Sequence, residues 1–395
     1  MDKSFRYVVV GCGGIGSAAA YQLAKESGGA VLGLDQYELG HTKGASSDHS
    51  RIIRMAQHQL PYARLAPHAY DAWHELEAEA GLQLLVKTGG LIIEATAERD
   101  AATTGTRNIA GYVAAFEELG FEYEVLESEA VMERWPQWRL SDTDRAIYSA
   151  DTGMVDAKRA TATHQALARA HGAELRGNTP VRALRRTPVG VEVVTDDDVF
   201  LAEHVVVATD AWTNELLAGV GVELPLTITE EQVTYYATQH LAAFSPERFP
   251  VFMWHGAHNF YGFPIHGEVA TKLGQHMGGH EVTTATRMTG PDPVREARQR
   301  EFLAEHLPEF GGPELFSKNC MYTIPPDQDF IVDTLPSAPE ISVVIGAGHA
   351  FKFAALLGKV LAQLATKGRT DFPIDAFSLS RPAIADPSFP RTFHV

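Results

Sequence analysis

The chain has little cysteine, no excess of positive charge and no long apolar segment, and each shortage excludes a class of protein. Its 395 residues include two cysteines, Cys12 and Cys320, too few for a disulfide framework or a four-cysteine zinc site. Its 33 basic and 50 acidic residues leave a net charge of −17, which disfavours nucleic acid and anionic membrane surfaces as partners. We therefore expect a soluble, cytoplasmic protein of two or three domains, with no nucleic-acid or membrane partner.

Residues 7–24 carry no charge and superficially resemble a secretory signal sequence. Four glycines between positions 11 and 16 interrupt this stretch, and no other segment approaches the roughly 20 apolar residues of a membrane span. A nucleotide-binding loop accounts for the same residues better.

Residues 6–10 are predicted to form a buried strand, and residues 17–25 a helix, with Gly11, Gly13 and Gly16 at the turn. A second strand, 30–34, ends at Asp35, nineteen residues after Gly16. In such a βαβ unit the glycine backbone and the helix N-terminus bind a pyrophosphate, and the acidic residue accepts hydrogen bonds from a ribose. The alternative is a glycine-rich turn without a ligand. The carboxylate disfavours a 2′-phosphate, so the pattern predicts FAD or NAD and leaves the choice open.

Two further predicted strands, 205–208 and 342–345, also run into small or polar residues. Three such junctions suggest one nucleotide-binding domain assembled from separated segments, 1–85, 146–215 and 316–395. Residues 86–145 and 216–315 would form a second domain. Helices are expected near 62–80, 100–119, 160–171, 293–306 and 351–367, and strands at 90–94, 181–194 and 224–272.

Six motifs occur in order along nearly the whole chain. Because of these motifs, the chain resembles the monomeric sarcosine oxidase and N-methyltryptophan oxidase family of the D-amino-acid-oxidase superfamily. The resemblance implies an α/β fold, with a Rossmann-like FAD-binding domain and a second α+β substrate domain built on a mixed, largely antiparallel sheet. The motifs are the glycine loop with Asp35, Arg51-Ile-Ile-Arg54, Tyr261-Gly-Phe-Pro264, Lys272-Leu-Gly274, Cys320-Met-Tyr-Thr323 and Phe351-Lys-Phe353.

The resemblance also implies how the cofactor is held. It makes Cys320 the residue whose sulfur bonds covalently to the 8α carbon of the flavin, whereas a free thiol without this context is usually a buried, inert group. Besides the glycine loop and Asp35, the cofactor-binding positions implied are Val181, Gly346, Gly348 and Lys352.

The same resemblance assigns roles to charged and aromatic side chains around the flavin. Lys272 would lie at its reactive edge and stabilise the charge formed as oxygen is reduced, although a lone lysine is usually a solvated surface group. Arg51 would lie beside the flavin, and Arg54 with Lys352 would bind a substrate carboxylate, a task suited to the guanidinium fork. The remaining expected substrate or catalytic contacts are Tyr261, Tyr322, Met55 and His276.

The implied reaction is oxidation of the C–N bond of a secondary or tertiary amino acid, N-methyl or cyclic, to an imine, with O2 reduced to H2O2 by a monomeric enzyme. Two alternatives remain: a dehydrogenase using FAD or NAD with another acceptor, and a catalytically silent flavin-binding protein. His276 and His280 have metal-ligand spacing only in a helix, which Gly278-Gly279 disfavours, so no metal site is expected.

The chain departs from the family pattern at several positions. Residues 46–50 read Ser-Ser-Asp-His-Ser where relatives commonly carry a His-His-Gly-Asp stretch, and Met55 stands where histidine is common. Asp210 stands where a glycine usually closes the strand, and the loop 346–350 is one residue shorter, which weakens the prediction for Lys352. Trp254 and His255 also differ from the pattern, so the expected substrate is not sarcosine itself.

Overall fold

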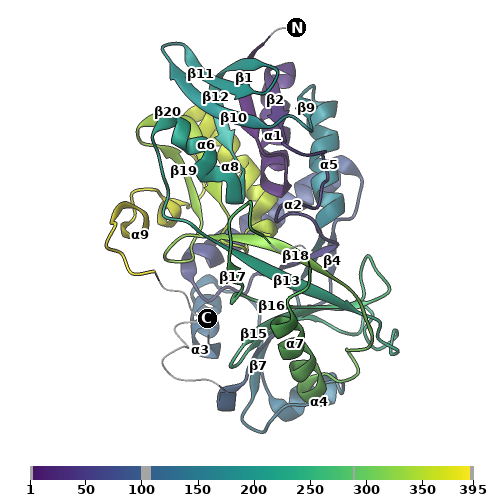
Figure 1. Ribbon diagram of the computed structural model, residues 1–395. Helices are drawn as coiled ribbons and strands as arrows, with labels where there is room; N and C mark the ends of the chain where they lie inside the picture. The colour runs from purple at the N-terminus through teal and green to yellow at the C-terminus, as the bar shows by residue number, and fades with distance from the viewer. Residues whose placement is uncertain (1–2, 99–107, 288–289, 392–395) are drawn as a thin grey trace.

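The computed structural model describes residues 3–98, 108–287 and 290–391. Figure 1 shows two lobes, and the long strands β13 and β18 cross the molecule between them. Within the described ranges, no helix is long and apolar enough to cross a membrane.

The first lobe is built on an eight-stranded sheet in the order β10-β11-β12-β1-β2-β9, to which β20 and β19 add beside β12. Its centre is parallel, because β1 pairs in parallel with both β12 and β2. These strands are apolar and buried, as expected for a parallel sheet covered on both faces. The strands are β1 (Ser4–Val10), β2 (Val31–Leu34), β9 (Glu174–Arg176), β10 (Val181–Thr187), β11 (Gly190–Thr195), β12 (Val199–Val207), β19 (Ile331–Leu335) and β20 (Ala338–Ile345).

Helices α1 (Gly14–Ser27), α5 (Ala157–Ala170) and α8 (Ala354–Lys367) pack together on this sheet (Figure 1). Small residues allow the close approach of α1 and α8: a Cβ on Gly358 would lie 2.6 Å from the Ala18 backbone. The long helix α2 (Leu60–Ala80) also contacts α8 and carries buried Trp73. The short helices α6 (Thr213–Leu217) and α9 (Pro382–Ala385) complete the lobe.

The second lobe is built on a nine-stranded sheet in the order β17-β13-β16-β15-β14-β5-β7-β6, with β18 paired to β13. Every pairing in it is antiparallel except that of β14 with β5. The strands are β5 (Gly90–Glu94), β6 (Glu124–Glu127), β7 (Arg145–Ser149), β13 (Thr227–Tyr236), β14 (Val251–His255), β15 (Asn259–Phe263), β16 (Thr271–Gln275), β17 (His280–Glu281) and β18 (Glu314–Ile324). Its helices are α3 (Ile109–Leu119), α4 (Ser128–Arg134) and α7 (Pro293–His306).

A small antiparallel sheet joins the lobes, in the order β3-β8-β4. It comprises β3 (Ser50–Ile53), β8 (Gly153–Asp156) and β4 (Leu85–Lys87). Strand β3 matters for the site, because it holds Arg51 and ends just before Arg54.

The predicted fold class is confirmed. The helix expected from residue 100 is described only from Ile109, since 99–107 lie outside the described residues. Strand pairing puts 314–324 in the sheet of the second lobe, because β18 lies along β13 from Thr227 to Tyr236. The division into domains stays a prediction, and a division by sheets would end the second domain after Ile324.

Candidate functional site

A cavity of about 1030 Å³ opens where the carboxyl ends of β1, β2 and β20 meet the second sheet. This is the edge at which parallel α/β sheets bind their ligands. Of the sixteen residues to which the sequence assigned a site role, thirteen line it: Gly11, Gly13, Asp35, Arg51, Arg54, Val181, Tyr261, His276, Cys320, Tyr322, Gly346, Gly348 and Lys352. Gly16, Met55 and Lys272 are not among its lining residues.

The glycine loop between β1 and α1 requires glycine for steric reasons. Gly11 has φ +90°, and a Cβ there would lie 2.4 Å from the Ala208 carbonyl oxygen. A Cβ on Gly16 would lie 1.8 Å from the Gly11 carbonyl oxygen, so this glycine lets the helix start close to the strand. The loop leaves the N-terminus of α1 facing the cavity.

Asp35 follows β2 at the edge of the cavity and is buried. Its carboxylate accepts hydrogen bonds from the backbone N–H groups of Cys12, at 2.9 Å, and Tyr37, at 3.0 Å. His41 Nε2 also lies 3.2 Å from its Oδ1. Because a carboxylate can accept about four hydrogen bonds, capacity remains for one ribose hydroxyl.

The loop after β20 brings Lys352 to the cavity despite its shortness. Ala347 has φ 46° and Gly348 φ 75°, and a Cβ on Gly348 would lie 2.2 Å from the Tyr322 ring. The turn closes through the N–H of His349, which donates to the Gly346 carbonyl at 2.9 Å. The Lys352 ammonium donates in turn to the His349 carbonyl at 2.6 Å.

Arg54 and Lys352 form a pair of cations at the cavity. Arg54 Nη1 donates to the Tyr112 hydroxyl at 3.2 Å, while Arg54 Nε is buried without a hydrogen-bond partner in the described ranges. In the same ranges neither cation forms an ion pair with a carboxylate. Burial, and to a smaller extent Arg54, hold the pKa of Lys352 well below its usual range. Buried charges are normally paired, so this arrangement is suited to an anionic ligand.

A polar network continues from Arg54 along the cavity wall. The Tyr112 hydroxyl lies 3.3 Å from His255 Nε2, and His255 Nδ1 lies 3.0 Å from Asn259 Oδ1. Sequence reasoning did not identify Tyr112 or Asn259 as site residues. The only sequence signal for this network was that His255 differs from the family pattern, because Tyr112 reads as an ordinary buried position of helix α3.

Three rings form an aromatic wall. The His276 ring centroid lies 6.4 Å from that of Tyr261 and 6.0 Å from that of Tyr322. Burial raises the pKa of both tyrosines, so their phenols are neutral. His276 follows β16 and His280 lies in β17, so the helical geometry needed for a shared metal does not occur.

Met55, expected to contact substrate, is partly buried and packs against the hydrophobic core of the first lobe. Its position gives no support to a substrate contact, because the backbone after β3 turns this side chain towards apolar neighbours. The role therefore stays a prediction without structural support.

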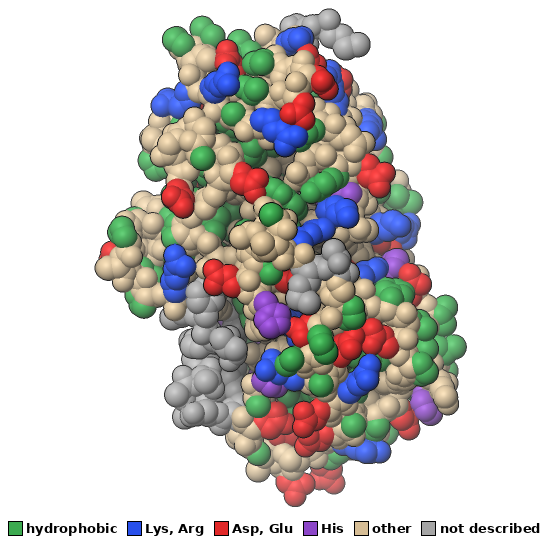
Figure 2. Space-filling view, viewed as in Figure 1, with side chains coloured by type: hydrophobic (Ala, Val, Ile, Leu, Met, Phe, Trp, Pro, Cys, Tyr) green, Lys and Arg blue, Asp and Glu red, His purple; other side chains and the backbone are tan. Residues whose placement is uncertain are grey.

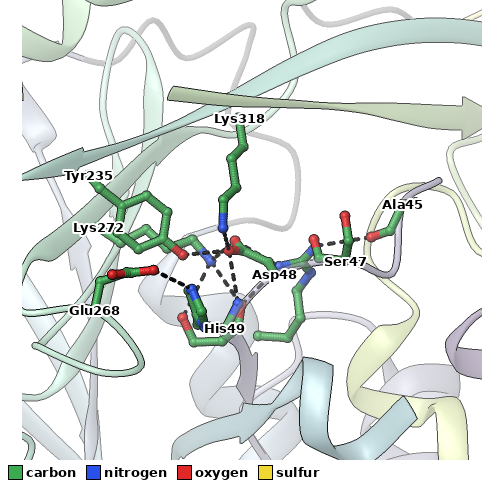
Figure 3. Close-up of polar contacts among 10 residues, drawn as sticks. Ala45, Ser47, Asp48, His49, Tyr235, Glu268, Lys272 and Lys318 are labelled. Atoms are coloured by element: carbon green, nitrogen blue, oxygen red, sulfur yellow. Dashed lines mark hydrogen bonds and ion pairs between the residues drawn. The ribbon is translucent and has the colours of Figure 1, made fainter. Parts of the chain in front are cut away.

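Lys272, on β16, lies below the cavity wall with 2% of its side chain exposed. Its Nζ is 2.5 Å from Asp48 Oδ2 and donates to the Ser50 carbonyl at 2.9 Å. Figure 3 shows Asp48 at the centre of a cluster with Lys272, Tyr235 and Lys318. Burial lowers the pKa of Lys272 to about 8, although Asp48 opposes the shift. Sequence reasoning noted Asp48 only as part of an unusual loop.

Arg51, on β3, joins the same carboxylate: its Nη1 donates to Asp48 Oδ2 at 3.1 Å. Its guanidinium also donates to the carbonyls of Ser50, Ala45 and Ser47 at 2.9, 3.0 and 3.1 Å. Burial alone would raise the pKa of the Asp48 carboxyl, but the charges of Lys272 and Arg51 outweigh burial and hold this pKa far below its usual range.

Cys320 lies on β18, opposite Glu231 of β13, and is partly exposed to the cavity. Burial raises the pKa of its thiol to about 12, and the nearby positive charge of Arg51 opposes this shift. The thiol is therefore protonated at neutral pH before any reaction.

The fold and site define a class of protein: residues 6–364 match the model of the family described as FAD dependent oxidoreductase, and the chain belongs to this family. It is 32% identical to monomeric sarcosine oxidase of Bacillus sp. (strain NS-129), over 97% of this chain and 98% of that protein. It is 30% identical to N-methyl-L-tryptophan oxidase of Escherichia coli O81 (strain ED1a), over 95% and 98% of the two chains. The solved structure of NikD, an unusual amino acid oxidase essential for nikkomycin biosynthesis, superposes with a TM-score of 0.83 at 26% identity, covering 95% of this chain and 97% of that one.

The residues present fit the cofactor that the family implies. Glycines whose Cβ atoms would collide form the cradle at the start of α1, and Asp35 has room for a ribose hydroxyl. The family decides the open choice between FAD and NAD in favour of FAD.

Figure 2 shows basic and acidic side chains interspersed on the face in view, with hydrophobic ones scattered among them. The cations of the site are instead gathered inside the cavity, where they can attract an anion despite the net negative charge.

Proposed function

We propose that this protein oxidises the C–N bond of a secondary or tertiary amino acid, N-methyl or cyclic, to an imine, and that O2 is reduced to H2O2. The observation that carries the proposal is the pair Arg54, whose Nε is buried, and the buried Lys352, two basic side chains at the cavity without a carboxylate partner in the described ranges. Two relatives of the chain are named as oxidases of N-methylated amino acids, which supports the same substrate class.

Arg54 and Lys352 bind and orient the substrate carboxylate. The free Nε of Arg54 offers one hydrogen bond, and the ammonium of Lys352 contributes its remaining donors. A carboxylate bound there restores charge balance in the pocket, so binding energy is gained where the protein alone is destabilised. Fixing the carboxylate also fixes the amine relative to the aromatic wall.

The aromatic wall holds the amine, since the faces of Tyr261 and Tyr322 can attract a methylated ammonium. The ammonium must lose a proton before its C–N bond is oxidised. Tyr322 is a poor proton acceptor because its phenol is neutral with a strongly raised pKa. Of the two candidates, the His276 imidazole is therefore the one we propose as the base.

FAD, when bound, would accept the hydrogen and electron pair of the C–H bond next to the amine nitrogen, so that the C–N bond becomes an imine, and would pass the electrons to oxygen. The glycine loop, Asp35, Val181, Gly346 and Gly348 hold the cofactor, and Cys320 attaches it covalently. Arg51 and Lys272 supply positive charge on the wall near it, Lys272 from behind the wall.

The substrate is larger and more polar than sarcosine in this proposal. Tyr112, His255 and Asn259 line the cavity beyond Arg54 and form hydrogen bonds with one another. Such a wall favours an amino acid whose side chain carries hydrogen-bonding groups. We propose that the protein acts as a monomer in the cytoplasm.

Acid precipitation of the purified protein tests the cofactor assignment. We expect yellow colour to remain with the pellet and to be lost to the supernatant in Cys320→Ala. Cys12→Ala is the matched control, because Cys12 is buried beside Asp35 and should not affect attachment. A colourless wild-type pellet would reject covalent attachment through Cys320.

A peroxide-coupled screen of N-methyl and cyclic amino acids tests the reaction. We expect peroxide with at least one amine that carries a free carboxylate, and a much lower but measurable rate with its methyl ester. Equal rates with acid and ester would reject the proposed role of Arg54 and Lys352.

A further inference from the structure

Asp48 is a buried carboxylate that the proposed reaction does not use directly. It lies in the loop between β2 and β3, with 3% of its side chain exposed, and it lines the cavity. Its Oδ2 accepts from Lys272 and Arg51, and its Oδ1 from the Tyr235 hydroxyl and the His49 backbone N–H. A carboxylate accepting this many hydrogen bonds is held rigidly and remains ionised.

The acceptors around Lys272 match the number of protons on its ammonium. The three N–H bonds have three acceptors: Asp48 Oδ2 at 2.5 Å, the Ser50 carbonyl at 2.9 Å and the Ser50 hydroxyl at 3.3 Å. The ammonium also lies 4.3 Å from the centre of the Phe263 ring. Lys272 therefore has no donor left for a ligand in the cavity.

The other charged and titratable groups facing Lys272 come from each neighbouring element. Arg51 on β3 and Lys318 on β18 act on it as like charges, and both disfavour its ammonium form. Tyr235 on β13 presents its ring 5.9 Å away and its hydroxyl to Asp48. Asp48 is thus the group that favours the charged form of Lys272, against burial and two cations.

We propose that Asp48 is the positioning residue of the oxygen reaction: it holds the Lys272 ammonium charged and behind the cavity wall, and so sets the pH range in which the reduced enzyme reacts with oxygen. The inference rests on the proposed function, in which reduced FAD passes two electrons and two protons to O2. The positive charge needed for that step then depends on an ion pair between β16 and the loop before β3.

The sign of the effect follows from the groups named. Lys272 is charged below its pKa of about 8, so the rate of reoxidation should fall as pH rises through that value. Removing the charge of Asp48 leaves burial, Arg51 and Lys318 unopposed. The pKa of Lys272 then falls further, and the decline in rate moves to lower pH.

The test compares the holoenzyme with Asp48→Asn, which keeps the size of the side chain. Each protein is reduced with amine without oxygen, mixed with oxygen, and followed by flavin absorbance over a range of pH. We expect the midpoint of reoxidation to shift down by about one pH unit or more, with the rate of reduction by amine changed less than about twofold. Glu268→Gln is the matched control: Glu268 pairs with His49 beside Asp48 and does not touch Lys272.

A second measurement does not depend on turnover. Sulfite binds to oxidised flavin more tightly when positive charge lies nearby, and its affinity is read from bleaching of the flavin. We expect the pH midpoint of sulfite affinity to shift down in Asp48→Asn by the same amount as that of reoxidation. Lys272→Arg, which remains charged throughout, should abolish the decline with pH whether or not Asp48→Asn folds.

Coincident midpoints in the wild type and Asp48→Asn would overturn the inference while leaving amine oxidation intact. An unchanged decline in Lys272→Arg would overturn it equally. If no amine reduces the flavin, the proposed function fails, and the sulfite titration still decides the role of Asp48.

Discussion

Two pairs of basic side chains lie at the cavity or directly behind its wall, and they differ in one respect. Arg51 and Lys272 share the carboxylate of Asp48, whereas Arg54 and Lys352 form no ion pair with a carboxylate in the described ranges. The charges of Arg51 and Lys272 are balanced within the protein by Asp48, whereas Arg54 and Lys352 keep N–H donors for a ligand. The comparison indicates that the first pair holds structure and charge in place, while the second is arranged to bind a ligand.

The physical basis of this difference is the cost of burying charge. An unpaired cation in a water-poor pocket destabilises the fold, so it persists where function requires it. Two residues separate Arg51 from Arg54, yet the end of β3 turns them to different partners. Spacing along the chain therefore says little about which arginine binds substrate.

The largest expected effect is on substrate selection by Arg54. Arg54→Met should lower kcat/KM for the amino acid by roughly 100- to 1000-fold, because a charge-assisted carboxylate contact is lost. The methyl ester of the same substrate is the control and should be affected by less than about threefold. A loss of equal size for acid and ester would contradict the assignment.

A second prediction contrasts the two arginines in stability. Arg51→Met should lower the free energy of unfolding by about 3 kcal/mol, since it strands Asp48 and loses hydrogen bonds to three carbonyls. Arg54→Met should change it by less than about 1 kcal/mol, because the protein alone provides few partners there. Urea unfolding followed by tryptophan fluorescence measures both, and equal losses would remove the distinction.

The smallest expected effect is a change in protonation on binding. The pKa of Lys352 is held well below its usual range, so a substrate carboxylate should raise it and binding should take up a proton near neutral pH. Calorimetry in buffers of different ionisation enthalpy measures this uptake, with a non-oxidised carboxylate analogue as ligand. Lys352→Met should abolish the uptake, and uptake that persists in this variant would assign it to another group.

Much of the fold could be predicted because its signals are local. The strand, glycine loop and helix over residues 6–25 are contiguous, and β5 and α7 have the predicted bounds. The place of β18 could not be inferred in the same way. Its partner β13 lies far away in the chain, and pairing between distant strands leaves no periodic signal in either one.

The residues of the candidate site divide in the same way, into those with a local sequence signal and those whose place depends on contacts between distant segments. The local motif predicted the glycine loop and Asp35, and the family resemblance added Arg51, Arg54 and Lys352; except for Gly16, all of these residues line the cavity. Lys272 lies behind the wall and pairs with Asp48 because β16 folds beside the loop that precedes β3. Lys272 and its hydrogen-bond partner Ser50 are 222 residues apart in the chain. Burial and charge pairing at such separations arise only when the chain is packed, since neither residue type alone implies the other as its partner.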